Sequence, residues 1–187
     1  MKTWKEVSGY FDVLPLAACI SQRIFCVHGG ISPDLNDLNT IRNIQRPLDI
    51  TDTGIEADLL WADPADTTRW QMNESRGVSY CFGPPQIDEF LKKFDFDLIA
   101  RAHMVVEDGF EFFHNRKLVT LFSAPDYCGE FQNKGGIMLV DADLHVTFKF
   151  LDNSVHRPLQ SGSVEAIHEH ESDIEDSLSS IDSRSTK

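Results

Sequence analysis

The chain has 187 residues, of which 41% are hydrophobic, and a formal net charge of −13 at pH 7. That apolar content is enough for one domain with a buried core, and the negative charge argues against nucleic acids and anionic membrane surfaces as partners. The N-terminal residues show no signal-peptide pattern, and no apolar run approaches the ~20 residues that span a bilayer. Four cysteines without CxxC spacing favour reduced thiols in a protein of the cytoplasm or nucleus.

Apolar spacing predicts three helices in the front part of the chain. Near the N-terminus, helical spacing links Trp4, Val7, Phe11 and Leu14. Residues 32–44 repeat apolar positions after a Ser-Pro-Asp start, which is typical of a capped first turn. Residues 84–94 begin with two prolines and place four apolar side chains on one face: Ile87, Phe90, Leu91 and Phe94.

Strands are predicted on both sides of these helices. Residues 14–20 and 23–28 indicate two strands joined at Ser21 and Gln22. After residue 97 strands dominate, and the segments that indicate them are 97–103, 117–125, 135–142 and 144–151. The last segment alternates apolar and polar residues from Leu144 to Phe150, as a half-buried strand does. The fold class predicted for residues 1–151 is therefore α+β.

Residues 152–187 differ from the rest of the chain. They are rich in Ser, Asp and Glu and contain no aromatic residue. Such a segment buries too little apolar surface to offset its ordering entropy, so we expect a disordered tail. Ser172 directly precedes Asp-Ile-Glu-Asp, a setting that suits an acidophilic kinase, although a passive solvated tail fits the composition as well.

His28 and His103 share one sequence context. Each follows an apolar strand segment and leads into a loop, and His28 is followed by two glycines. A histidine at a strand end is commonly a hydrogen-bonded structural residue. Two of them in matching contexts can converge at one sheet edge and share a transition-metal ion, since imidazole is a preferred ligand.

Other residues admit both a functional and a structural interpretation. Arg76 precedes a glycine among small polar residues, so it is either an oxyanion clamp or an exposed loop arginine. Residues 123–131 combine Pro, Gly, Tyr127 and acids after a buried strand, which fits a loop over a site or a plain turn. Asp58 and Asp63 flank Leu-Leu-Trp, and the second of them marks a helix end on the structural reading.

Five motifs occur together in one order: "FCVHGGISPDL", "DLLWADP", "RGVSYCFG", "RAHMVVEDGFEFF" and "LVTLFSAPDYCGEF". In this combination the chain closely resembles the C-terminal half of the metal-dependent phosphoprotein phosphatases, over residues from about 4 to 151. It is most similar to the type-1 serine/threonine phosphatase catalytic subunit. The element "SAPxYCGEF" favours type 1 over the related type-2A enzymes.

The resemblance implies a β-sandwich flanked by helices, and hydrolysis of phosphoserine and phosphothreonine at two divalent metal ions (Mn, Fe or Zn). It implies that His28 and His103 ligate one ion. Arg76 and Tyr127 are similar to the family's phosphate-holding groups, while Trp61 and Asp63 match positions near the cleft. The inhibitor-contacting loop corresponds to residues 126–131, with Cys128, Glu130 and Phe131.

Several family motifs do not occur in this sequence. GDxHG, GDxVDRG and GNHE, which supply the bridging aspartate, the other ligands and the general-acid histidine, are missing. We therefore identify no general acid and expect at most one partial metal site, in a C-terminal portion that is inactive alone. Smaller departures are Asp126 in place of the usual Asn and Ser75 in place of an acid before Arg-Gly.

The resemblance also implies an alternative, non-catalytic function. Type-1 enzymes bind regulatory subunits through a groove that accepts Val-x-Phe peptides, and Val146 here replaces its usual Cys. Without the resemblance, these positions would be assigned to core strands. The matching residues in this sequence are Ile24, Asp97, Leu98, Phe112, Leu144 and Phe148. Phosphoprotein substrates and such regulatory subunits are thus the expected partners.

Overall fold

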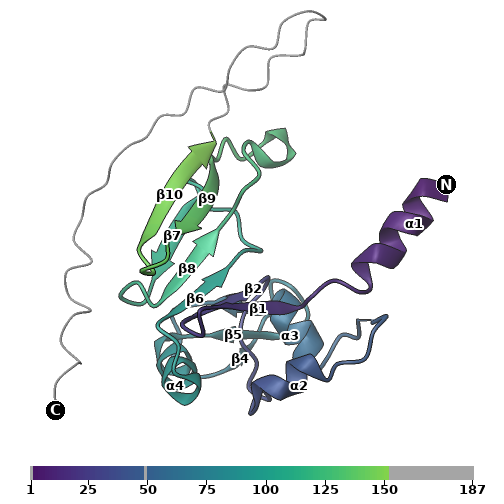
Figure 1. Cartoon of the computed structure of the whole chain (residues 1–187), viewed down its shortest axis with the longest axis horizontal. Coiled ribbons are helices and arrows are strands. Elements are labelled where there is room, and N and C mark those ends of the chain that lie inside the picture. The colour runs from purple at the N-terminus through teal and green to yellow at the C-terminus, as the bar shows by residue number, and fades with distance from the viewer. Residues whose placement is uncertain (1, 49, 152–187) are drawn as a thin grey trace, which may run out of the picture.

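A central sheet organises the molecule. The computed structural model describes residues 2–48 and 50–151 (Figure 1). The sheet has five strands, in the order β1 (Ala17–Ile20), β2 (Ile24–Val27), β6 (Leu98–Arg101), β8 (Leu118–Leu121) and β7 (Phe110–Phe113). The strands β2, β6 and β8 run parallel, whereas the two edge strands are antiparallel to their neighbours. Because β2 and β6 are parallel neighbours, the segments that follow them leave the sheet at the same edge.

The two faces of this sheet are buried against different layers. Successive side chains of a strand point to opposite faces. In β2, Ile24 belongs to one apolar cluster and Phe25 to another, and in β6 Leu98 and Ile99 divide in the same way. All four residues of β6 are buried. The central strands therefore carry two cores, one on each side.

A hairpin of β9 (Gly135–Val140) and β10 (Val146–Leu151) covers the first face, over β7 and β8 (Figure 1). Aromatic stacking joins these layers. The rings of Phe110 and Phe148 are nearly parallel with centroids 4.0 Å apart, and Phe112 meets Phe148 edge to face at 5.7 Å. Two sheets packed through such contacts form the sandwich that was expected.

Helices and a small sheet cover the second face. The helices are α3 (Ile55–Trp61) and α4 (Pro84–Phe94), and the small sheet consists of β3 (Asp63–Pro64), β5 (Tyr80–Phe82) and β4 (Gln71–Met72). Phe25 packs against Phe90 of α4 with ring centroids 5.0 Å apart, and Phe96 closes the cluster. This core packs against the face of β2 and β6 that α3 and α4 cover.

Several predicted elements are confirmed. Helix α4 has the predicted bounds, and the Gln86 side chain accepts the Gly83 N–H at its N-terminus at 3.0 Å. The turn at Ser21 and Gln22 has positive φ at both residues, 48° and 59°, as a tight hairpin turn requires. Helix α1 (Lys2–Phe11) forms as well, but it projects away from the described domain, and Trp4 is 73% exposed (Figure 1).

Several predictions of element boundaries are wrong. The first helix ends at Phe11, before Leu14, the strand expected over residues 14–20 begins at Ala17, and the strand expected over 117–125 ends at Leu121. The helix expected over residues 32–44 is only α2 (Leu38–Arg42), capped by Asp37. The Ser32 side chain accepts the Asp34 N–H at 3.2 Å and donates its hydroxyl to the buried Asp58 carboxylate at 2.6 Å, so it forms a turn that does not continue into a helix. Leu144 has φ 66°, which places it in the turn, and the last strand begins at Val146.

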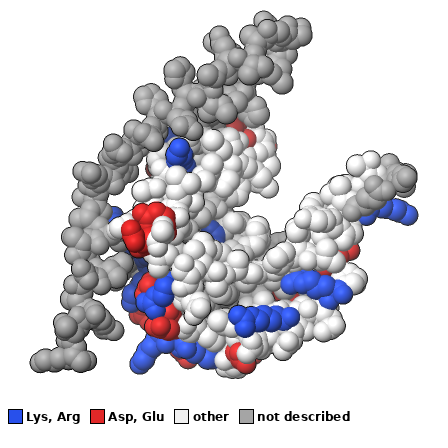
Figure 2. Space-filling model, in the orientation of Figure 1, with Lys and Arg blue, Asp and Glu red and all other residues white. Residues whose placement is uncertain are grey.

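The predicted tail, with Ser172, lies outside the described residues, so its disorder and its phosphorylation stay predictions. Within residues 2–48 and 50–151, no helix is long and apolar enough to cross a membrane. On the face shown in Figure 2, acidic and basic side chains lie close together near α4. This face therefore carries charges of both signs.

Candidate metal and phosphate site

His28 and His103 meet at the edge where β2 and β6 end. His28 directly follows β2, and its carbonyl oxygen accepts the Ala102 N–H at 3.0 Å. This bond continues the pairing of the two strands by one step. It brings Nε2 of His28 to 3.1 Å from Nδ1 of His103, with ring centroids 5.0 Å apart. The two histidines that share a sequence context therefore also share a site.

The position of His103 is fixed by its backbone and by Trp61. Its φ of 66° lies in the left-handed region, which costs free energy for a residue with a Cβ. The ring of Trp61 stands edge to face against the His103 imidazole at 5.2 Å. The Nε2 of His103 is buried and has no hydrogen-bond partner among the described residues. A strained, half-buried imidazole with an unpaired nitrogen is typical of a functional position.

The nitrogen pair fits one divalent ion. Two ligands at the usual metal–nitrogen distance of about 2.0–2.1 Å, at roughly a right angle, lie about 3 Å apart. Desolvation, with the charge of Arg76, lowers the pKa of His103 to about 4, and desolvation, with the charge of Arg101, lowers the pKa of His28. Both rings are thus neutral near pH 7, as metal ligands must be. No third described Asp, Glu, Cys or His joins them within 4.8 Å.

Arg76 lies beside the histidines because Asp63 holds it. Its Nε donates to Oδ2 of Asp63 at 2.9 Å, and its Nη2 donates to the His103 carbonyl oxygen at 3.3 Å. Asn73 donates to the same Asp63 oxygen at 3.0 Å. The Arg76 side chain remains 30% exposed, so its other N–H groups can bind an oxyanion.

The Asp63 carboxylate forms ion pairs with two guanidinium groups, those of Arg76 and Arg101. Arg101, whose side chain has no exposed surface, donates to Oδ1 of Asp63 at 2.7 Å. Burial by itself raises the pKa of Asp63, but hydrogen bonds from Arg76 and Asn73 and the charge of Arg101 together lower the pKa below its ordinary value. One carboxylate and two cations leave a net positive charge beside the histidine pair, which favours an anionic ligand despite the acidic composition.

The glycines after His28 allow close packing rather than an unusual turn. Neither Gly29 nor Gly30 is among the residues with positive φ. A Cβ on Gly29 would lie 2.5 Å from the backbone nitrogen of Trp61, and one on Gly30 would lie 2.8 Å from the Phe82 ring. The Gly29 N–H donates to the Leu59 carbonyl oxygen at 2.7 Å. These contacts fix the loop after His28 against α3.

The sequence profile of the calcineurin-like phosphoesterases, the Metallophos family, matches residues 1–107, more than half of the chain. The chain belongs to this family. A solved structure of a protein serine/threonine phosphatase from Saccharomyces cerevisiae, described as similar to human phosphatase PP5, is 29% identical with a TM-score of 0.76. That match covers 84% of this chain and 53% of the solved chain, so this metallophosphoesterase spans about half of its relative's length. The family uses divalent metal ions.

Among the described residues of this metallophosphoesterase, no hydrogen bond or ring contact joins Tyr127 of the loop 126–131 to the histidine pair. Tyr127 packs against Phe122 with ring centroids 5.0 Å apart, and among the described residues no hydrogen bond joins its hydroxyl to Arg76. Asn133 holds the loop by accepting the Tyr127 N–H at 3.0 Å. Asp126 has φ 47°, a conformation that Asp tolerates as Asn does. The predicted role of Tyr127 at a phosphate stays a prediction.

The rest of this loop is open to solvent. Cys128 and Glu130 are exposed, and Phe131 is 54% exposed. A cavity of about 420 Å³ lies between the loop and the segment after His103, and it is lined by Val105, Glu107, Phe131, Gln132 and Asn133. The expected inhibitor loop is therefore accessible.

The predicted docking residues lie on the far side of the metallophosphoesterase sheet from α3 and α4. Ile24 and Leu98 are buried in the cluster between the sheet and the β9–β10 hairpin. Phe112 and Phe148 are half-buried at its margin, and Asp97 is exposed at the start of β6. Leu144 lies in the turn before β10. The six positions thus combine core residues with a partly open aromatic rim.

Sequence reasoning missed residues that support the site. Arg101 was assigned only to a buried strand, and no pattern marks Asn73. Asp58 accepts hydrogen bonds from Ser32 at 2.6 Å and Ser79 at 2.7 Å, so it ties the loop after His28 to the segment after Arg76. The sequence singled out Asp58 only as an aspartate next to Leu-Leu-Trp, and nothing in it indicated the two serine partners.

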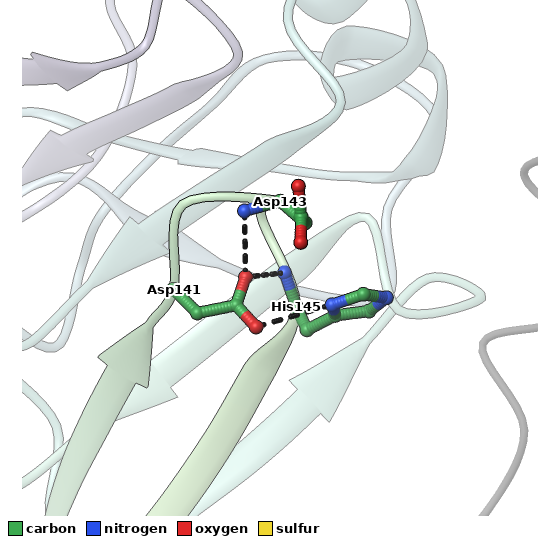
Figure 3. A group of neighbouring side chains, drawn as sticks. All are labelled: Asp141, Asp143 and His145. Carbon is green, nitrogen blue, oxygen red and sulfur yellow. Dashed lines mark hydrogen bonds and ion pairs between the residues drawn. The ribbon is translucent and has the colours of Figure 1, made fainter.

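A second group of polar side chains lies in the turn between β9 and β10. The possible ligand atoms of Asp141, Asp143 and His145 lie within 4.8 Å of one another, and all three residues are exposed (Figure 3). The Asp141 carboxylate already accepts the N–H groups of Asp143 and His145, at 2.9 and 2.8 Å. These bonds explain the arrangement as a closed turn. The sequence predicted the turn but not the grouping.

Proposed function

We propose that this metallophosphoesterase chain serves in the hydrolysis of phosphoserine and phosphothreonine in proteins. The observation that carries the proposal is the pair of imidazole nitrogens 3.1 Å apart with the Arg76 guanidinium fixed beside them. Two neutral nitrogen ligands for a metal ion, next to a partly exposed guanidinium, suit the binding of a phosphate ester. The likeness to a serine/threonine phosphatase, at 29% identity, supports this choice among phosphoesters.

The chain's own residues bind and orient the substrate. Arg76 offers N–H groups to two phosphate oxygens, while Asp63 keeps its Nε in place. His28 and His103 would hold a divalent ion (Mn, Fe or Zn) through Nε2 and Nδ1, which lie 3.1 Å apart. When bound, such ions lower the pKa of a coordinated water and offset the charge of the phosphoryl group. We assign no general acid to this chain.

Low turnover by these 187 residues alone is part of the proposal. Two neutral nitrogens give an ion no charged ligand, and the described residues add no third ligand within 4.8 Å. A second ion next to the first also lacks a bridging carboxylate in this set. The element "SAPDYCGEF" supports assignment to the type-1 class. The four unpaired cysteines support a location in the cytoplasm or nucleus.

Phosphate binding and turnover test this function with one pair of variants. We would measure Mn²⁺-dependent binding of inorganic phosphate and phosphate release from a phosphothreonine peptide, for the unmodified chain, Arg76→Ala and Arg69→Ala. Arg69 is an exposed arginine outside the site. Loss of the Arg76 guanidinium should weaken phosphate binding about tenfold or more, and loss of Arg69 should not. Equal phosphate binding by both variants contradicts the proposal, and turnover near that of a complete family member contradicts the proposed low activity.

As a second candidate, we propose that the chain binds regulatory subunits that carry Val-x-Phe segments. The half-buried rings of Phe112 and Phe148 support it, as does the edge of β10, which pairs only with β9 among the described strands. An extended peptide can add to such an edge and insert its apolar side chains beside the rings.

A matched pair of hairpin variants tests this docking. Phe148 faces the sheet, whereas Leu139 lies on the outer face of the same hairpin and is 41% exposed. We expect Phe148→Ala to weaken binding of a Val-x-Phe peptide and Leu139→Ala to leave it unchanged. A peptide with both anchor residues replaced by Ala is the ligand control. Binding of that peptide as tightly as the original would refute a specific groove.

A further inference from the structure

Arg101 is the largest fully buried side chain of the described residues, and its guanidinium joins three segments. It ends β6, two residues before His103. Its Nε donates to the Gly29 carbonyl oxygen at 2.6 Å, and its Nη2 donates to the Ala62 carbonyl oxygen at 3.2 Å and to Asp63 at 2.7 Å. One side chain thereby holds the loop after His28, the end of α3 and the carboxylate that holds Arg76.

We infer that Arg101 is a positioning residue that sets the His28 imidazole and, through Asp63, the Arg76 guanidinium in one fixed arrangement. The inference rests on the proposed phosphate-binding role of Arg76. Arg101 itself contacts neither the histidine rings nor the open side of Arg76. It acts on His28 through the backbone of Gly29, and on Arg76 through the two oxygens of one carboxylate.

Stability alone does not explain an arginine at this place. Removing a guanidinium from water is costly, and well-packed apolar residues commonly replace buried ion pairs without loss of stability. The cost is larger here because Nη1 of Arg101 is buried without a partner among the described residues. One carboxylate oxygen of Asp63 binds Arg76. The other oxygen requires a second cation if the carboxylate is to stay in one orientation. Arg101 supplies that cation, while the Arg76 side chain remains 30% exposed.

The same two strands offer a matched control at their opposite ends. Arg23, just before β2, pairs with Asp97, just before β6, through its Nε and Nη2. This ion pair fastens β2 to β6 as Arg101 does, but it lies at the end remote from the histidines. Arg23→Met therefore removes an arginine tie between the same strands without touching the site.

Two measurements on the full chain separate positioning from support of the fold. The first is the imidazole ¹⁵N spectrum of His28 and His103 without added metal. The second is the affinity for inorganic phosphate in the presence of Mn²⁺. We expect Arg101→Met to move both imidazole signals and to weaken phosphate binding about tenfold, as the loss of a supporting hydrogen-bond partner typically does. Arg101→Lys keeps the charge but not the forked bonds, so it should restore only part of the affinity, and Arg23→Met should change neither readout.

Combining Arg101→Met with Asp63→Asn tests the route of the effect. If Arg101 acts on Arg76 through Asp63, the second substitution should add little to the phosphate effect of the first. Additive losses, or imidazole signals that move no more than in Arg23→Met, overturn the inference. If the unmodified chain binds no phosphate but Arg101→Met still shifts the imidazole signals, the positioning of His28 is supported. That result contradicts the proposed function and leaves the inference about His28 standing. If Arg101→Met does not fold, the comparison of Arg101→Lys with Arg23→Met decides.

Discussion

Nε2 of His28 lies 3.1 Å from Nδ1 of His103, although 75 residues separate them in the chain. The parallel pairing of β2 with β6 produces this approach, because Cys26 is paired with Ala100 and the bond from Ala102 to His28 extends the register beyond the strands. Desolvation, with the charges of Arg76 and Arg101, lowers the pKa of both rings and so favours their neutral form. The two rings thus lie within hydrogen-bond distance of each other, in the arrangement on which the proposed metal site depends.

Removing either histidine should abolish this paired binding. We expect His103→Asn and His28→Gln each to weaken Zn²⁺ or Mn²⁺ binding about tenfold or more, because one imidazole alone gives no chelate. The double variant should bind little worse than either single one. Isothermal titration calorimetry of the full chain measures all three affinities.

A histidine outside the pair serves as the control for this experiment. His114 lies at the β7–β8 turn and pairs with Asp88 of α4 at 2.8 Å. His114→Gln should bind metal as the unmodified chain does. If it loses affinity as His103→Asn does, the ions bind nonspecifically to imidazoles and the paired site is wrong.

The sequence predicted the candidate site better than it predicted what supports it. His28 and His103 could be found because an apolar run that stops at a histidine is visible in the sequence. Arg101 could not be found in this way, since arginine is almost never fully buried. Its place in "LIARAH" does not indicate which groups its side chain binds. Those partners, Gly29 and Asp63, lie 72 and 38 residues away in sequence.

Local patterns also set the limits of the fold prediction. Helix α4 was predictable because its proline start and its apolar spacing agree. The strands β3 and β4 have two residues each, too few to show any periodicity. The start of α2 was mistaken because Ser32 does accept a backbone N–H, from Asp34, but this turn does not continue, and the helix begins only at Leu38, behind its cap Asp37.

The metal-free protein should lose stability as the pH falls below neutrality. The pKa of His103 is lowered from 6.5 to about 4, so between these values the unfolded chain binds a proton that the folded chain does not. The free energy of unfolding therefore decreases as the pH falls through this window, by at most about 3 kcal/mol for this residue and by less to the extent that solvent screens the partly exposed ring. Urea unfolding at pH 7, 5.5 and 4 measures the effect.

Comparison of two variants isolates this histidine from the carboxylates that titrate nearby. His103→Asn should reduce the loss of stability between pH 6.5 and pH 4. His145→Asn, at an exposed histidine of the β9–β10 turn, is the control variant. An equal pH dependence in the unmodified chain and in His103→Asn would show that other groups carry the acid sensitivity.

Asp58 should be among the most destabilising aspartates to replace. It is 2% exposed and is the acceptor for the hydroxyls of Ser32 and Ser79. Asp58→Ala leaves both hydroxyls without their partner in the core, and we expect a loss of about 2–4 kcal/mol in the free energy of unfolding. Asp66→Ala, at an exposed aspartate, should stay within about 0.5 kcal/mol. A loss no larger than that for Asp58→Ala would mean that water replaces the carboxylate without cost.

Gly29 should tolerate no side chain, although its φ is not positive. An added Cβ would lie 2.5 Å from the Trp61 nitrogen, and a backbone atom of α3 cannot move aside as a flexible side chain can. We expect Gly29→Ala to destabilise the fold by about 1–3 kcal/mol and to shift the neighbouring His28. Gly9→Ala in α1, where nothing lies within 4 Å, should instead gain about 0.5–1 kcal/mol from helix propensity. Thermal unfolding and metal titration of both variants measure these effects. If Gly29→Ala is as stable as the unmodified chain and binds metal equally well, close packing of this loop on α3 does not position His28.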